Sequence, residues 1–421
     1  MEISQLYAIY KASEGLCTDT RTLRPGQLFL ALKGENFNGD NFALQALEAG
    51  AAYAVVSDAL EASDPRLIRV PDTLSTLQAL AAYHRQQFDI PVIGLTGTNG
   101  KTTTKELIKA VLSAKYRVTA TEGNLNNDVG VPLSVFRIGE DTEIAIIEMG
   151  ASHPEDLRPL LAVAQPTHGL ITNVGKAHLL GFGSFEGVKH AKGLLYDYLK
   201  EHDGIAFANA DDPDLQEMLW ERGLPRIPYG MDGVTVLPAS ACSPYLRLQF
   251  AAGVLPTHLV GAYNANNILA ALKIGWFFGV PEADAWKAIS SYIPSNNRSQ
   301  LLKTEKNTLI VDAYNANPSS MAVALDNLAL TEGRKVALLG EMRELGADAA
   351  AEHRKIVERL QGTEAYLVGE AFAKAAEGTD IPVFASSDQL AAYLHEHPLE
   401  GCTVLVKGSR GTRMEKVIPS L

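Results

Sequence analysis

The sequence predicts an α/β protein built from three domains, on two observations. The chain has 421 residues, and at roughly 150 residues per domain this length suggests about three domains. Apolar segments with strand character alternate with helical segments, a pattern typical of parallel sheets covered by helices. We therefore expect an N-terminal α/β domain over 1–90, a central parallel-sheet domain over 91–295, and a Rossmann-like C-terminal domain over 296–421.

The first block contains two expected strands and two expected helices. GQLFLALKG and AAYAVVSD are short apolar runs typical of strands, and NFALQALEAGA between them has a helical pattern. DTLSTLQALAAYHRQQF is a strong helical pattern, and Asp72 is its expected N-cap. Pro91 then opens the next block.

The central block begins with PVIGLTG, a short apolar strand that runs directly into a glycine turn, and TTTKELIKAVLSAKY follows as a helix. EIAIIEMG and THGLITNVG are two more expected strands. Because parallel sheets bind ligands at the carboxyl ends of their strands, we expect Thr96, Gly97, Glu148 and Asn173 near a site. The last block has strand patterns but no GxGxxG motif, and its expected strands are TLIVDAYN, KVALLGE, EAYLVGE, PVFAS and CTVLVKGS.

Composition excludes several classes of protein. Hydrophobic residues make up 46% and charged residues 20%, which is ordinary for a globular protein, and the net charge of -12 disfavours general binding to nucleic acid or anionic membranes. Cys17, Cys242 and Cys402 form no CxxC pair, which indicates free thiols in a reducing compartment. No signal peptide or apolar membrane span is evident. We expect a cytoplasmic monomer with no nucleic-acid partner and no membrane insertion.

The glycine turn predicts a nucleotide phosphate site. A strand, a Gly-rich turn and a helix that begins with Lys-Thr are the context of a P-loop, in which backbone N–H groups and the helix N-terminus face an anion. Lys101 would reach the β- and γ-phosphates of ATP, and the Thr102 hydroxyl would bind Mg²⁺. Leu95 stands where the general GxxxxGK[ST] pattern has its first glycine. The expected ATP-binding residues of this loop are Gly97, Thr98, Asn99, Gly100, Lys101, Thr102 and Thr103.

Two further residues are candidates for a metal site. Glu148 ends an apolar strand, and a carboxylate at that position suits Mg²⁺, which prefers oxygen ligands. His178 follows the segment ITNVGKA, and from the residues alone a single histidine is more often structural than a metal ligand.

These stretches together resemble the Mur ligase family of ATP-dependent amide ligases. GTNGKT is similar to the P-loop variant of that family, which accounts for Leu95. The resemblance extends over nearly the whole chain, through TEGNLNNDVGVPLSV, EMGASHPEDL, NVGKAHLLGFGSFEGVKHAKGLLY, GAYNANNILAAL and DAYNANPSSM. The N-terminal CTDTRTLRPGQLFLALKGENFNGDNF resembles the UDP-binding domain of family members.

The resemblance implies roles for individual residues. Glu148 and His178 become Mg²⁺ ligands, and Lys192 matches a lysine that CO₂ converts to a carbamate supporting a second Mg²⁺; Lys189 is expected to be an ordinary solvated lysine. Asn264 and Asn267 are expected to contact adenine. The implied catalytic residues are Lys101, His178, Lys192 and Arg298, of which Arg298 would contact the γ-phosphate, and Asp312 would bind the ribose. The implied substrate-binding residues are Thr20, Arg21, Asn126, Asn127, Tyr314, Asn315, Asn317, Lys407 and Arg410.

Four stretches, DAYNANPSSM, LGEMRELG, AEHRKI and LVKGSRGTRMEKVI, are similar to family members whose substrates are UDP-N-acetylmuramoyl-tripeptide and D-alanyl-D-alanine. The implied route passes through an acyl phosphate, which must be shielded from water. YIPSNNRS is an expected hinge for closure, and KGSRGTR is expected to hold a peptide carboxylate through its arginines. Tyr263 and Leu180 depart from the family pattern, where histidine and glutamate are expected, and so does NGDNF (38–42).

Three alternatives remain. A folylpolyglutamate-type ligase would share the P-loop and metal residues, but DTR, LFLALKG and KGSR argue against it. A Mur ligase that adds the third peptide residue is disfavoured by DAYNANP and LGEMRELG. A nucleotide-dependent switch without ligase turnover would bind nucleotide and release no phosphate in response to substrates.

Overall fold

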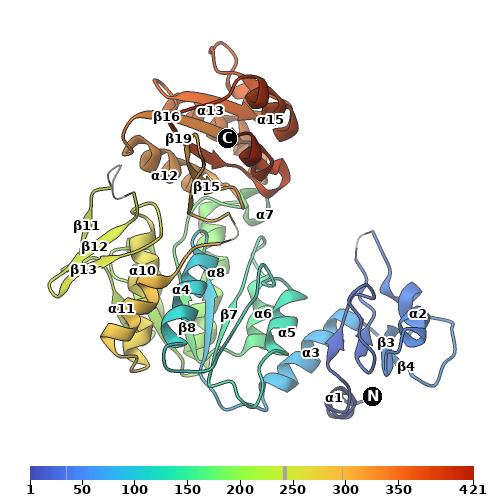
Figure 1. The fold of residues 1–421 in the computed structure, drawn as a ribbon. Coiled ribbons are helices and arrows are strands. Elements are labelled where there is room, and N and C mark those ends of the chain that lie inside the picture. Colours follow the sequence, from blue (N-terminus) through green and yellow to red (C-terminus); the bar gives the residue numbers. More distant parts are fainter. Residues whose placement is uncertain (35, 240–243, 296) are drawn as a thin grey trace. The chain divides into compact units, whose positions relative to one another are not determined.

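The structure is a computed structural model that describes residues 1–34, 36–239, 244–295 and 297–421 (Figure 1). Of the predicted features, Cys242 and the Asn296 position of the expected hinge lie outside these residues. The described chain forms two compact units, one made of 1–94, 118–150 and 156–167, and the other of 95–117, 151–155 and 168–421. The α/β class predicted from the sequence is confirmed by the mixture of helices and mainly parallel sheets. The three-domain division stays a prediction.

The N-terminal part of the first unit is a parallel four-stranded sheet with the order β1-β2-β3-β4. Buried aliphatic side chains pack on both of its faces, as expected for parallel strands. The Asp72 carboxylate accepts a hydrogen bond from the Ser75 N–H at 2.6 Å, which confirms the predicted N-cap. Its elements are α1 (Ile3–Lys11), β1 (Leu16–Cys17), β2 (Leu28–Leu30), η1 (Gly39–Phe42), α2 (Ala43–Glu48), β3 (Tyr53–Ser57), β4 (Leu67–Val70) and α3 (Thr73–Arg85).

The central sheet has the strand order β10-β9-β8-β5-β7-β6. Strands β5, β7 and β8 fall on the three apolar runs predicted from the sequence, and β5 leads directly into α4. The strands are β5 (Val92–Thr96), β6 (Val118–Ala120), β7 (Ile144–Glu148), β8 (His168–Ile171), β9 (Ile205–Asn209) and β10 (Arg226–Tyr229). The helices between and after them are α4 (Lys101–Leu112), α5 (Gly130–Val135), α6 (Leu157–Ala164), α7 (Leu179–Phe182), α8 (Phe185–Glu201), α9 (Pro213–Arg222), α10 (Asn264–Phe277) and α11 (Glu282–Ser291).

A small antiparallel sheet, β11-β12-β13, was not predicted from the sequence. It consists of β11 (Thr235–Leu237), β12 (Arg247–Phe250) and β13 (Gly253–Pro256). These strands are short and half-exposed, so their sequence carries little of the apolar character that marks the strands of the larger sheets.

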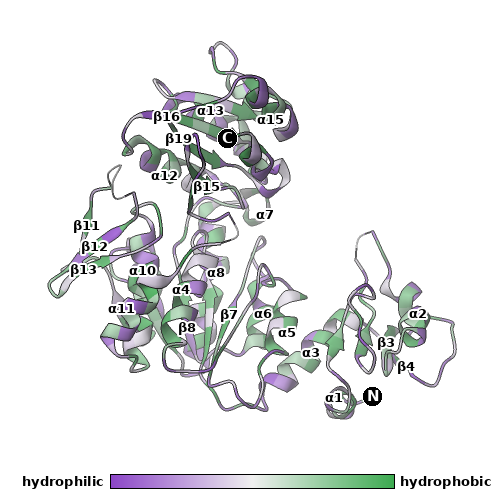
Figure 2. Cartoon of the chain, in the orientation of Figure 1, coloured by the Kyte–Doolittle hydropathy of each residue, from purple (hydrophilic) through white to green (hydrophobic). Residues whose placement is uncertain are grey.

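The C-terminal sheet has the order β14-β15-β19-β16-β17-β18, and all five strands predicted for it are present. Only β14, which pairs antiparallel with β15, was not predicted. Separate apolar cores cover the two faces, and the strands of the larger sheets are mostly green in the hydropathy colouring of Figure 2. Its elements are β14 (Gln300–Lys303), β15 (Thr308–Asp312), α12 (Pro318–Ala329), β16 (Arg334–Gly340), η2 (Gly346–Asp348), α13 (Ala349–Arg359), β17 (Glu364–Val368), α14 (Glu370–Ala375), β18 (Val383–Phe384), α15 (Ser387–Glu396), β19 (Cys402–Lys407), η3 (Arg410–Thr412) and η4 (Met414–Ser420).

A search of the described residues finds no helix that is both long and apolar enough to cross a bilayer.

Asn307, in the turn between β14 and β15, connects this turn to the start of β19 and to the C-terminal residue through hydrogen bonds. Its amide donates to the carbonyls of Leu399 (2.7 Å) and Leu421 (2.8 Å) and accepts from the Cys402 N–H (3.1 Å), and the side chain is buried. We predict that Asn307→Ala lowers the local opening free energy of β19 by about 2 kcal/mol, because buried polar groups lose their partners. Hydrogen exchange of the backbone amides over 402–407 measures this opening free energy.

The neighbouring Lys306→Ala is the control, since the Lys306 side chain makes a half-exposed ion pair with Glu400 at 3.2 Å. Such a pair is worth about 0–1 kcal/mol. Equal exchange in the two variants would contradict the structural role given to Asn307.

Candidate active site

The phosphate loop connects β5 to α4 through two glycines in left-handed or otherwise Gly-favouring conformations. Gly97 has φ +145° and Gly100, at the N-cap of α4, has φ +78°. The Thr104 N–H donates to the Gly100 carbonyl at 2.8 Å. The N–H groups of Lys101, Thr102 and Thr103 therefore lie in the first helical turn, where backbone donors have no intrahelical acceptor and suit an anion.

The segment after β8 fixes the phosphate loop through hydrogen bonds. The Thr98 N–H donates to the Asn173 carbonyl and the Asn99 N–H to the Asn173 amide oxygen, each at 3.0 Å. The Asn99 carbonyl accepts from the Thr172 hydroxyl at 2.6 Å and from the Asn173 amide at 3.0 Å. These bonds bring the predicted strand-end residue Asn173 to the loop.

Steric contact as well as backbone conformation requires glycine at position 97. A Cβ built on Gly97 would lie 1.9 Å from the Thr172 hydroxyl oxygen, far inside contact distance. The Lys101 ammonium lies over the same loop, where it donates to the carbonyls of Gly97 (2.7 Å) and Thr98 (3.2 Å). This geometry is suited to the predicted phosphate role of Lys101, which stays a prediction.

The start of α10 packs against the start of α4. The Asn267 amide oxygen accepts from the Thr104 hydroxyl at 3.0 Å, and its NH₂ donates to the Asn264 amide oxygen at 2.9 Å. Asn264 in turn donates to the Val260 carbonyl at 2.7 Å, and both asparagines are buried. Successive hydrogen bonds thus orient the two residues predicted to contact adenine beside the phosphate loop. Their contacts with the nucleotide stay predictions.

His178 and Lys192 both lie near the ring of Phe182. The His178 ring is 6.3 Å from the Phe182 ring, and the Lys192 ammonium lies 5.6 Å from the same ring. Burial, with a smaller contribution from the Lys101 charge, lowers the pKa of Lys192 to about 7. Burial also lowers the pKa of His178, while the Glu344 carboxylate acts in the opposite direction. Lys192 is therefore set apart from an ordinary lysine.

Lys189, three residues earlier on α8, has a different environment. Its ammonium pairs with Glu217 at 2.5 Å and with Asp214 at 3.2 Å, and hydrogen bonding to Glu217 raises its pKa. The Lys189 ammonium is thus neutralised by carboxylates, which distinguishes it from Lys192.

The predicted metal residue Glu148 lies in the first unit, at the end of β7. It is buried, its carboxylate accepts from the Asn126 amide at 2.9 Å, and its N–H donates to the Thr121 hydroxyl at 3.0 Å. Asn127 accepts from the Gly130 N–H at 2.8 Å at the start of α5. Among the described residues no three His, Cys, Asp or Glu side chains cluster closely enough for a metal site. The donor types of Thr102, Glu148 and His178 nevertheless fit Mg²⁺, which accepts few protein ligands and retains water.

The remaining predicted residues of the first unit are Thr20 and Arg21. Arg21 forms an exposed ion pair with Asp19 at 2.5 Å, and hydrogen bonds from Arg21 lower the pKa of Asp19 to about 2. No described contact links Thr20 or Arg21 to a pocket, and their substrate contacts stay predictions.

Asp312, at the end of β15, is paired with Lys407 at the end of the neighbouring strand β19. The Lys407 side chain is 1% exposed, and its ammonium also donates to the Asn315 carbonyl at 3.3 Å. The Asp312 carboxylate accepts from the Ser299 N–H at 3.3 Å. Lys407 thus has an internal partner, and the substrate contact predicted for it, like the ribose contact of Asp312, stays a prediction.

The Tyr314 ring lies close to two arginines. The Arg298 guanidinium carbon is 3.6 Å from the centre of the Tyr314 ring, and that of Arg410 is 5.7 Å from it. Asn317 caps α12 by accepting from the Ser320 N–H at 2.9 Å, and its NH₂ donates to the Asn99 side chain at 2.7 Å. This hydrogen bond brings the segment DAYNANPSSM to the phosphate loop.

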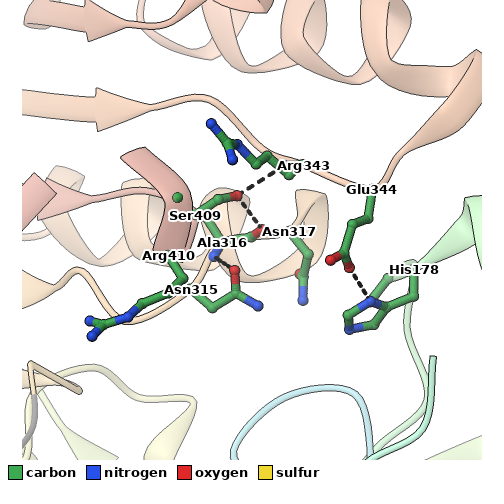
Figure 3. A pocket seen from close by; sticks show the side chains of 10 residues that line it. His178, Asn315, Ala316, Asn317, Arg343, Glu344, Ser409 and Arg410 are labelled. Carbon is green, nitrogen blue, oxygen red and sulfur yellow. Dashed lines mark hydrogen bonds and ion pairs between the residues drawn. The ribbon is translucent and has the colours of Figure 1, made fainter. Parts of the chain in front are cut away.

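A pocket of about 220 Å³ opens beside these residues (Figure 3). It brings together His178, Asn315, Asn317 and Arg410, which were predicted from the sequence, with Arg343 and Glu344, which were not. The other lining residues are Ala177, Ala316, Ser409 and Gly411. LGEMRELG was a family signature in the sequence, but nothing in its spacing indicated that its Arg343 and Glu344 reach this pocket.

Comparisons with known proteins agree with this arrangement. The family descriptions "Mur ligase family, catalytic domain", "Mur ligase middle domain" and "Mur ligase, glutamate ligase domain" match residues 13–85, 95–275 and 297–410. The UDP-N-acetylmuramoyl-tripeptide--D-alanyl-D-alanine ligase of Bacillus subtilis is 35% identical over 429 residues, covering 97% of this chain and 93% of that protein. The chain belongs to the Mur ligase family.

Two solved structures of MurF ligases are similar to this Mur ligase over its whole length. That from Acinetobacter baumannii is 28% identical with a TM-score of 0.86, covering 100% of this chain and 98% of that one. That from Thermotoga maritima, in complex with ADP, is 28% identical with a TM-score of 0.85, covering 96% of each chain. The family predicted from the sequence is therefore confirmed.

We predict that Gly97→Ala strongly weakens nucleotide binding, because the methyl group would overlap Thr172 and displace the loop. The expected loss of ADP affinity, measured by calorimetric titration, is about 100-fold or more, comparable to losing several charge-assisted hydrogen bonds.

Gly378→Ala is the matched control, since Gly378 also has positive φ (+81°) but has nothing within 4 Å of its added Cβ. It should bind ADP like the unchanged protein. Undiminished ADP binding by Gly97→Ala would refute the fit of this loop to phosphate.

Proposed function

We propose that this chain is an ATP-dependent ligase that joins D-alanyl-D-alanine to UDP-N-acetylmuramoyl-tripeptide. Its product would be the UDP-N-acetylmuramoyl-pentapeptide precursor of peptidoglycan. The observation that carries the proposal is the whole-length similarity to the B. subtilis ligase of that name. The hydrogen bond between Asn317 and Asn99 supports it, because it brings the signature segment of such ligases to the phosphate loop.

We propose that the reaction proceeds through an acyl phosphate. A carboxylate oxygen of the tripeptide attacks the γ-phosphorus of ATP, and ADP leaves as the bond to the β-phosphate oxygen breaks. Lys101, the first-turn N–H groups of α4 and Arg298 would neutralise charge on the transferred group. The amine of D-alanyl-D-alanine then attacks the acyl carbon, loses a proton, and expels phosphate from the tetrahedral intermediate.

The pocket residues are the proposed peptide contacts. Asn315, Asn317 and Arg410 offer amide and guanidinium groups around one cavity, and the Tyr314 ring lies next to the Arg410 guanidinium. An exposed guanidinium is suited to a peptide carboxylate. Thr20, Arg21, Asn126 and Asn127 of the first unit are the proposed contacts to the UDP-linked substrate. Asn264, Asn267 and Asp312 are the proposed contacts to adenosine.

Mg²⁺ bound through Thr102, Glu148 and His178 would supply further positive charge to the phosphoryl oxygens. We propose that CO₂ forms a carbamate on Lys192, which would give a buried lysine the oxygen donors that a second Mg²⁺ requires. Carbamate formation needs the neutral amine, and the lowered pKa of Lys192, about 7, provides it near neutral pH. Such a ligase would work as a monomer in the bacterial cytoplasm, where ATP is available.

The alternatives differ in their acceptor. A folylpolyglutamate-type ligase or a ligase of the third peptide residue would use the same phosphate loop but another amine. A nucleotide-dependent switch would show no release of phosphate in response to substrates. The similarity to a dipeptide-adding ligase over 97% of the chain favours the dipeptide.

The test is phosphate release from ATP and Mg²⁺ with UDP-N-acetylmuramoyl-tripeptide, with and without D-alanyl-D-alanine. We expect release only when both are present, together with a pentapeptide product seen by mass spectrometry. Absence of release with both the lysine and the diaminopimelate tripeptides would reject this function and leave the other amine acceptors to be tried.

We predict that protein incubated with ¹³C-bicarbonate shows a carbamate carbon signal in its NMR spectrum, and that Lys192→Arg abolishes the signal because arginine stays protonated. Since the lowered pKa of Lys192 is about 7, the signal should weaken as the pH falls below 7 and the amine becomes charged. Lys189→Arg is the control and should keep the signal. A signal that survives in Lys192→Arg would place the carbamate elsewhere.

A further inference from the structure

We propose that Glu344 is a positioning residue for His178: its carboxylate holds Nδ1 of the imidazole and thereby turns Nε2 toward the metal site. The proposal rests on the proposed function, in which His178 is a Mg²⁺ ligand. Neither residue type nor spacing pointed to Glu344 in the sequence, and its role comes from one contact in the pocket.

The contact joins two segments far apart in sequence. The Glu344 carboxylate contacts His178 Nδ1, as the dashed line in Figure 3 shows. The same two segments also meet through the backbone, since the Leu180 N–H donates to the Glu344 carbonyl at 3.4 Å. Both His178 (φ +51°) and Glu344 (φ +64°) adopt left-handed conformations that cost energy in residues other than glycine. Two strained residues that face each other indicate that their orientation is fixed by the surrounding structure.

Glu344 follows two residues, Met342 and Arg343, whose backbone N–H groups are hydrogen-bonded to other segments. The Met342 N–H donates to Nε2 of the buried His353 at 2.9 Å, and the Arg343 N–H donates to the Ser409 hydroxyl at 2.9 Å. Since His353 Nε2 accepts a hydrogen bond from a backbone N–H, its Nδ1 carries the proton and donates to the Ala349 carbonyl at 2.7 Å. The motif AEHRKI therefore serves to hold the residues just before Glu344.

The chemistry of the pair determines which nitrogen is left for a metal. An ionised carboxylate only accepts hydrogen bonds, so Nδ1 of His178 must carry a proton toward Glu344. In neutral imidazole the lone pair then resides on Nε2, which becomes the ligating atom. Histidines that bind metals commonly donate their other N–H to a carboxylate in this way, which fixes the tautomer and makes the ring a better ligand.

A competing role for the same contact makes the opposite prediction. If the metal needed Nδ1, Glu344 would occupy the ligand atom and would have to leave before the metal could bind. Removing the carboxylate would then strengthen metal binding. The two roles are separated by the sign of one affinity change.

The experiment uses the full-length chain with ADP and Mn²⁺, a paramagnetic substitute for Mg²⁺. Free Mn²⁺ is measured by electron paramagnetic resonance, and electron spin-echo modulation detects a directly bound histidine nitrogen. We expect Glu344→Ala to weaken Mn²⁺ binding about 10- to 100-fold, the usual effect of removing such a partner, and to reduce the nitrogen modulation at equal Mn²⁺ occupancy. Glu344→Gln, whose amide oxygen still accepts from Nδ1, should restore most of both.

Lys176→Ala is the matched control. Lys176 lies two residues before His178, and its ammonium makes an ion pair with Glu352 of α13 at 3.8 Å. It should leave Mn²⁺ affinity and the nitrogen modulation unchanged. An equal loss in Lys176→Ala and Glu344→Ala would show that the contact only docks the segments, and unchanged or tighter Mn²⁺ binding in Glu344→Ala would overturn the positioning role.

Failure of this inference is distinguishable from failure of the proposed function. If the unchanged protein releases phosphate in response to both peptide substrates while Glu344→Ala keeps full Mn²⁺ affinity, the ligase assignment stands and the role of Glu344 falls. If the unchanged protein shows no substrate-dependent release, the ligase assignment fails, and the Mn²⁺ measurements still decide whether Glu344 orients His178.

Discussion

The close approach of the Gly97 backbone to Thr172 is the constraint on which the rest of the site depends. With 1.9 Å between a would-be Cβ and the Thr172 hydroxyl, the loop can only be built with glycine there, and its conformation follows from that requirement. The segment after β8 then fixes the amides of Thr98 and Asn99, so the next N–H groups, in the first turn of α4, are left for an anion. A phosphate site thus arises from backbone packing, and the Lys101 charge adds to it.

The same loop connects the phosphate site to the peptide-binding residues. Asn99 is bonded through its backbone to the β8 segment and through its side chain to Asn317 at the cap of α12. Asp312 ends β15, the strand before Asn317, and pairs with Lys407 at the end of the neighbouring strand β19. Because Lys407 is buried, removal of either partner would leave an uncompensated charge. These polar contacts fix the strand ends of the C-terminal sheet. The residues that follow those ends, Asn315, Arg343 and Arg410, line the cavity together with His178.

The local features of this protein could be predicted from the sequence because they depend on neighbours in the chain. The strand before Gly97, the cap at Asp72 and the five strands of the last block each follow from apolar periodicity or capping chemistry within a few residues. Contacts between distant segments could not be predicted in the same way. Glu344 lies 166 positions from His178, and their pairing depends on how His353 and Ser409 hold the intervening turn. Similarly, Tyr263, which departs from the family pattern, bonds the Ser299 hydroxyl at 2.9 Å, a partner that no sequence period indicates.

In the proposed reaction the phosphate loop serves to transfer the γ-phosphoryl group of ATP onto a peptide carboxylate before the dipeptide amine attacks. The most direct test is to supply UDP-N-acetylmuramoyl-tripeptide with ¹⁸O in its reacting carboxylate, with ATP, Mg²⁺ and D-alanyl-D-alanine, and to analyse the released phosphate by mass spectrometry. We expect one carboxylate oxygen to leave in each phosphate, because the acyl carbon–oxygen bond breaks when the amine attacks. Phosphate free of ¹⁸O, formed alongside the pentapeptide product, would contradict it.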